Sequence, residues 1–119
     1  MELEPRTGRV ISGRDLRYVL TVVLLDQRRA LTIDELVGAL DAMGLAVRGR
    51  ASKTIADALR WEIRRGRVRR AGRGRYRTGT IPRSTQWWLR QHALRVREGG
   101  SVAVHELQVR LRRLEQRSF

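Results

Sequence analysis

The chain has 119 residues, enough for one domain with an appendage but not for two full domains. It lacks cysteine and has only two histidines, which excludes disulfides and thiolate metal sites and argues against a conventional zinc site. No apolar run is long enough to span a bilayer, and the N-terminus lacks an apolar signal core, so we expect a cytoplasmic protein. The net charge of +14 predicts a polyanionic partner, nucleic acid ahead of an anionic membrane surface.

The first half of the chain reads as a scaffold of two helices. Residues 1–13 are expected to be flexible, with a short extended piece at Val10 and Ile11. A helix over 14–28 follows Ser12 as N-cap, with apolar residues at helical spacing. Thr32 and Glu35 form a capping box that starts a second helix over 33–43. Residues 14–47 carry a net charge of −1, which indicates a supporting role.

The residue pattern in the middle of the chain predicts a helix followed by a basic hairpin. After a turn over 45–50, Ser52 is the expected cap of a third helix over 52–65. Strands over 67–71 and 75–78 flank the turn 72–74, with Val68 and Tyr76 facing inward and the neighbouring arginines facing out. Residues 48–77 contain eleven arginines and one lysine against two acids, a net charge of +10. Most of the chain's charge imbalance therefore lies on one helix–hairpin unit.

The C-terminal third predicts helices over 81–98, opened by Pro82 with Ser84 as cap, and over about 102–116. The helix over 81–98 has two stripes: one runs from Thr85 to Val96, and the second consists of Trp87, Gln91 and Leu94. The helix over about 102–116 has a heptad-like seam made by Val104, Leu107, Leu111 and Leu114. The seam of the last helix could pair with the helix over 81–98 or with a second subunit. Because one small domain leaves part of this apolar surface uncovered, we expect a homodimer through residues 82–117.

Three helices followed by a glycine-containing basic hairpin resemble a winged helix-turn-helix domain of the bacterial regulator type. The segments that carry the resemblance are TIDELVGALDAMG, GRAS, KTIADALRWEIRRG and RVRRAGRGRYR. The core GxxSKTI and the RGRY end of the hairpin are more loosely similar to HARE-type winged helices, which are associated with DNA-linked and restriction-type systems. The expected fold is mainly α with a small β-hairpin, a winged helix-turn-helix over 14–79 and a C-terminal helical extension over 80–119.

The resemblance implies double-stranded DNA as partner, with the helix over 52–65 in the major groove and the wing over 67–78 against the backbone or minor groove. Arg50 and Lys53 are candidates for guanine, Thr54 for a thymine methyl group, and Arg73 for a narrow minor groove. Asp57 either accepts from cytosine or pairs with Arg60 or Arg64 on its own helix, the alternative we favour. The candidate DNA-binding residues are Arg48, Arg50, Ser52, Lys53, Thr54, Arg60, Arg64, Arg69, Arg70, Arg73, Arg75 and Arg77.

The expected function is that of a small transcriptional regulator or nucleoid-associated factor, without cofactor, metal or catalysis, since no catalytic grouping or phosphate loop is present. One alternative is an accessory or antitoxin-like module that docks a protein at Trp61, Trp87 and Trp88, with DNA contact secondary. A structured-RNA binder is another. Trp87 and Trp88 are expected in core or interface packing rather than stacked on bases. A single outward arginine, such as Arg60, is equally well explained as a solvated surface side chain without a role in binding.

Overall fold

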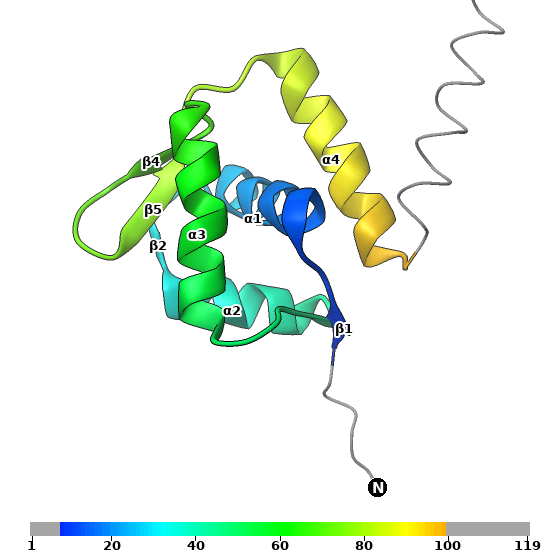
Figure 1. Cartoon of the computed structure of the whole chain (residues 1–119). Helices are drawn as coiled ribbons and strands as arrows, with labels where there is room; N and C mark the ends of the chain where they lie inside the picture. Colours follow the sequence, from blue (N-terminus) through cyan, green and yellow to red (C-terminus); the bar gives the residue numbers. More distant parts are fainter. Residues whose placement is uncertain (1–7, 100–119) are drawn as a thin grey trace, which may run out of the picture.

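The computed structural model describes residues 8–99, in which four helices surround one core and a small antiparallel sheet lies at one side (Figure 1). The elements in chain order are β1 (Arg9–Val10), α1 (Gly13–Gln27), β2 (Leu31–Thr32), α2 (Ile33–Ala42), β3 (Leu45–Ala46), α3 (Ala51–Arg64), β4 (Val68–Arg70), β5 (Arg75–Thr78) and α4 (Arg83–Arg97). The predicted fold class, mainly α with a small hairpin, is confirmed at this level. The helix expected over 102–116 lies outside the described residues.

Helix α1 is the centre of the molecule, because most of its surface is covered by other elements. Leu20 and Leu24 are fully buried, and every residue from Tyr18 to Leu25 is buried. It packs against α3 on one side and α4 on the other, as Figure 1 shows. Leu89 of α4 belongs to the same core as Ile55 of α3. The C-terminal extension is thus packed on the rest of the chain as far as α4.

Polar contacts also join α4 to α1. His92 is buried, and its Nε2 lies 2.9 Å from Asp15 Oδ1 at the start of α1. Its ring stands edge-on to the Tyr18 ring, with centroids 4.8 Å apart. Arg90 forms an ion pair with Asp26 at the other end of α1. These contacts join the middle of α4 to both ends of α1.

The sheet has the strand order β2-β5-β4, with antiparallel pairing throughout. In the hairpin, Val68 pairs with Thr78 and Arg70 pairs with Tyr76. Val68 and Tyr76 are buried, as the sequence predicts. Strand β2 was not predicted from the sequence. Its Leu31 pairs with Tyr76 and so ties the hairpin to the start of α2. The hairpin projects from the helices beside α3 (Figure 1).

Several helix starts and the N-terminal segment differ from expectation. Helix α3 begins at Ala51 with Arg50 as N-cap, so Ser52 lies in the first turn; α4 has Pro82 as N-cap, with Ser84 inside the helix. The Ser12 side chain caps α1 by position but makes no capping hydrogen bond. The short extended piece expected at Val10 and Ile11 is present in part as β1. Because β1 pairs in parallel with β3 and Ile11 is buried, residues 9–11 are part of the fold rather than of a flexible lead-in.

Candidate nucleic-acid interface

The outward face of α3 carries four charged side chains in one line, which we call the α3 stripe: Lys53, Asp57, Arg60 and Arg64. Asp57 lies in the middle of this stripe. Lys53 Nζ donates to its Oδ2 at 3.0 Å, and Arg60 Nη1 donates to its Oδ1 at 3.4 Å. The expected pairing of Asp57 within its helix is confirmed, with Lys53 as an additional partner. One carboxylate thus orients two exposed cations and leaves the stripe with a net charge of +2.

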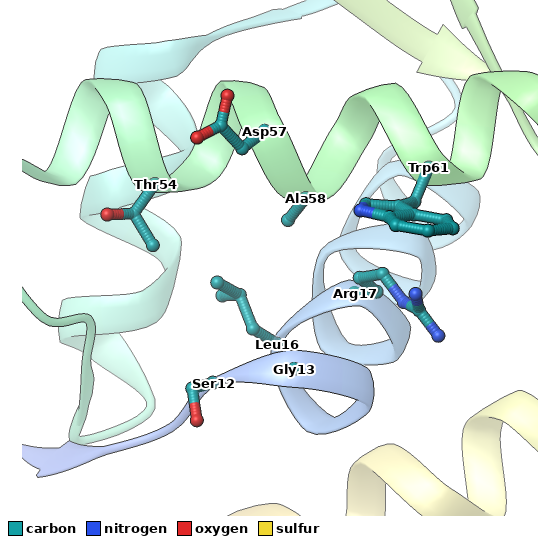
Figure 2. A pocket seen from close by; sticks show the side chains of 8 residues that line it. All are labelled: Ser12, Gly13, Leu16, Arg17, Thr54, Asp57, Ala58 and Trp61. Atoms are coloured by element: carbon teal, nitrogen blue, oxygen red, sulfur yellow. The ribbon is translucent and has the colours of Figure 1, made fainter.

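The turn before α3 exposes two more arginines. Arg48 and Arg50 are both exposed, and Arg50 as N-cap has an extended backbone. The Thr54 hydroxyl donates to the Arg48 carbonyl at 2.8 Å, which ties the turn to the helix. Figure 2 places Thr54 at a groove between α3 and the start of α1. The Thr54 hydroxyl is thus engaged within the protein, while the Ser52 side chain is exposed.

The hairpin presents three arginines on its outer face, which we call the hairpin face: Arg69, Arg75 and Arg77. Arg69 and Arg77 are direct cross-strand partners, and Arg75 lies two residues from Arg77 on the same face. All three are exposed, and among residues 8–99 none of them forms an ion pair. Like charges directly opposite each other in a sheet are unfavourable, so this face is suited to an anionic partner.

The tip and the inner edge of the hairpin differ from this face. Arg73 lies between Gly72 and Gly74, whose φ angles of 110° and 67° are ones that glycine adopts without strain. Arg73 is exposed at the end of the projecting loop. Arg70 is also exposed, but its guanidinium lies 5.7 Å from the centroid of the Tyr76 ring. Arg70 is thus held by an aromatic ring, while Arg73 lies in the exposed turn between the two strands.

A buried charged cluster joins α3 to the hairpin. Glu62 is fully buried, and its carboxylate accepts from Arg67 Nε at 2.7 Å and from Arg67 Nη2 at 3.1 Å. It also accepts from the Thr21 hydroxyl at 3.0 Å, and Arg17 Nε of α1 lies 3.6 Å away. The hydrogen bonds with Glu62 raise the pKa of Arg67. Arg67, expected to face out with its neighbours, is instead a structural side chain at the base of the hairpin.

Trp61 stands half-exposed on α3 at the edge of the groove in Figure 2. The guanidinium carbons of Arg17 and Arg64 each lie 5.5 Å from its ring centroid. Cation–π contacts of this kind orient guanidinium groups. The groove has a volume of about 210 Å³ and runs between α3 and the start of α1. Arg64 is therefore positioned at the end of the α3 stripe nearest the hairpin.

The other two tryptophans lie on α4. Trp88 is 40 % exposed, and its ring stands edge-on to Tyr18 with centroids 5.0 Å apart. Trp87 is 64 % exposed, the highest value among the large apolar residues of the described chain. Core or interface packing was expected for both, and Trp88 packs on the core through one edge. Trp87 has no such packing within residues 8–99.

Other kinds of site have little support in the described chain. No group of three or more histidine, aspartate or glutamate side chains within residues 8–99 is placed to hold a metal ion. None of the four described helices is long and apolar enough to cross a membrane. The chain matches no protein-family model, no curated protein and no solved structure. The geometry of the site and its charge are thus the basis for a functional proposal.

Proposed function

We propose that this protein binds double-stranded DNA through α3 and the hairpin β4–β5, in the manner of a winged helix-turn-helix domain. The observation that carries the proposal is the hairpin face, where Arg69, Arg75 and Arg77 have no ionic partner among residues 8–99. Three helices followed by a hairpin, with β2 completing the sheet, agree with the arrangement that the sequence resemblance implies. A compact array of guanidinium groups is the usual chemistry for phosphate contact.

In this proposal the two elements have different tasks. The α3 stripe lies in the major groove, where Lys53 and Arg60 donate to base edges or phosphates from positions set by Asp57. The hairpin face contacts phosphates, which positions the protein without reading sequence. Arg73 at the tip enters the minor groove, where a narrow A·T tract has the strongest negative potential. The protein acts as a regulator or nucleoid-associated factor in the cytoplasm.

The test is a fluorescence-anisotropy titration of a short random-sequence DNA duplex and an RNA duplex of equal length, over a range of salt concentrations. The unmodified protein is expected to prefer DNA and to lose affinity steeply as salt rises. R69Q is expected to lower the magnitude of the salt slope by about 1, as the loss of one phosphate contact requires. R73Q is expected to weaken DNA binding, because it removes the proposed minor-groove contact. Unchanged affinity and slope in both variants would remove the hairpin from the proposal.

The matched control is R97Q. Arg97 is also exposed, but it lies in the last turn of α4, away from the hairpin. It removes the same charge as R73Q, so it measures the general effect of net charge on DNA affinity. We expect its salt slope to equal that of the unmodified protein. An equal loss in R97Q and R73Q would indicate diffuse attraction rather than an interface at the hairpin.

A protein-docking function is the second candidate, because Trp87 is 64 % exposed on the outward side of α4. Exposed tryptophan is enriched at protein interfaces. In that case DNA would bind only at low salt, and a Trp87→Ala variant would keep its DNA affinity but lose the partner. If RNA and DNA duplexes bind equally, the same basic surface serves a structured RNA.

A further inference from the structure

The basic unit formed by residues 48–77 exposes a single acid, Asp57, in the middle of the α3 stripe. The other acid in this range, Glu62, is fully buried. The Asp57 side chain is 45 % exposed, and Figure 2 shows its carboxylate directed away from Leu16 and Arg17 of α1. Like charges oppose each other across an interface, so a carboxylate here weakens any contact of this face with phosphates.

The ion pairs of Asp57 contribute little to the stability of the fold. Its partners Lys53 and Arg60 are both exposed, and both belong to α3, so these contacts join no other element to the helix. Exposed pairs about one helical turn apart stabilise a helix only slightly, because water and salt screen them. The pairs are therefore weak enough to adjust when a stronger partner approaches α3.

The carboxylate of Asp57 keeps part of its capacity to accept hydrogen bonds. An ionised carboxylate offers about four lone-pair positions on its two oxygens. Lys53 Nζ occupies one position on Oδ2 at 3.0 Å, and Arg60 Nη1 occupies one on Oδ1 at 3.4 Å. Each oxygen can thus accept from a further donor. Pairing within α3 and acceptance from a base, which were alternatives from the sequence, are compatible in this arrangement.

We propose that Asp57 determines sequence specificity by accepting from the amino group of a cytosine in the major groove, an inference that rests on the DNA-binding function proposed above. Cytosine presents the N4 donor there, whereas guanine and thymine present acceptors that a carboxylate repels. Adenine has a donor at N6, but its N7 acceptor lies beside it. Cytosine is therefore the base that matches an isolated carboxylate best.

The cations on either side of Asp57 complete a pattern of donor, acceptor and donor along α3. Lys53 lies four residues before Asp57 and Arg60 lies three residues after it. The stripe between these two cations covers about 10 Å of helix axis, which corresponds to about three base pairs. Both cations fit the O6 and N7 acceptors of guanine, including the guanine that pairs with the cytosine. The proposed site is thus rich in G·C pairs, with a cytosine opposite Asp57.

The experiment selects bound sequences from a random duplex pool with the full-length protein and with D57N, D57A and E98Q. The unmodified protein is expected to enrich cytosine at one position. D57N should change that position alone to adenine, because an asparagine amide pairs with adenine N6 and N7. D57A should show no preference there. The control E98Q removes an exposed carboxylate at the end of α4 and should select the same sequence as the unmodified protein.

Affinity for the selected duplex gives the size of the contact. Fluorescence anisotropy compares this duplex with one in which the enriched cytosine is replaced by thymine. The unmodified protein and E98Q should discriminate between them by about five-fold or more, as one good base contact does. D57A should discriminate by no more than about two-fold. Circular dichroism checks that each variant keeps the helical fold.

The outcomes separate this proposal from the proposed function. If the unmodified protein does not bind duplex DNA, both are wrong. If it binds DNA but selects no sequence, or if D57N and D57A select the same sequence as it does, Asp57 does not read a base, and only the DNA-binding function stands. A preference that D57N alters at a position holding a base other than cytosine would contradict the proposed contact.

Discussion

Replacing Glu62 with glutamine tests whether the buried cluster holds α3, α1 and the hairpin together. The carboxylate is fully buried and faces Arg67, whose side chain is 17 % exposed, and Arg17, whose side chain is 14 % exposed. Removing one partner of a buried ion pair typically costs about 3–5 kcal/mol, because the remaining charge loses its compensation. Since both arginines keep some access to water, we expect a loss near the lower end, about 3 kcal/mol.

A loss of this size lowers the melting temperature of a domain of this length by about 10–20 °C, which thermal unfolding followed by circular dichroism measures directly. The control E98Q removes an exposed carboxylate at the end of α4 and should change stability by no more than about 0.5 kcal/mol. A double-mutant cycle with R67M should give a coupling energy of about 1–3 kcal/mol. If E62Q unfolds within about 3 °C of the unmodified protein, about 0.5 kcal/mol, the cluster does not stabilise the site as argued.

Four further substitutions test the fold. The pKa of Glu35 is lowered by its hydrogen bond to the Thr32 backbone. The ionised carboxylate therefore stabilises the fold above pH 4.5, and this stabilisation is lost as pH falls through the lowered pKa. The difference in melting temperature between the unmodified protein and E35Q should shrink as pH falls through this range. G38A should raise the free energy of unfolding by about 0.5–1 kcal/mol in urea. Gly38 lies inside α2, where alanine is favoured over glycine, and the added Cβ would have no other atom within 4 Å. G79A should lower it, because its Cβ would lie 2.2 Å from the Gly66 carbonyl oxygen. L89A, at a fully buried position, should cost about 2–5 kcal/mol in the same assay. No loss in either destabilising variant would contradict the packing described here.

Local sequence signals were sufficient to predict the helices and the hairpin. The capping box of Thr32 and Glu35 is present with both hydrogen bonds, because all its atoms lie within one turn of chain. Strands β2 and β3 could not be predicted, since each has two residues and exists only through pairing with β5 or β1. The start of α3 was misplaced by one residue because the Thr54 hydroxyl bonds to the preceding turn, and Ser52 does not cap the helix.

The candidate site was predicted in its outline but not in its internal contacts. Charge density identified α3 and the hairpin, and strand alternation correctly put Val68 and Tyr76 inside. The inward position of Glu62 follows from helical spacing, but nothing local indicates that Arg67 is its partner. That pairing depends on how the chain turns after Gly66, where the Arg67 amide donates to the Glu62 carbonyl. A glutamate on an otherwise apolar helix line followed by an arginine five residues later is the signal that could have found it.

The number of molecules that bind together sets a geometric requirement on the proposed DNA site. Each molecule carries one α3 and one hairpin. A monomer contacts one major-groove segment and the adjacent minor groove, so its site has no need of two-fold symmetry. A dimer would instead require two half-sites about one helical turn apart. Selection of bound sequences from a random pool distinguishes the two cases, because an enriched palindrome would indicate the homodimer expected from the sequence, whereas an enriched site without two-fold symmetry would contradict it.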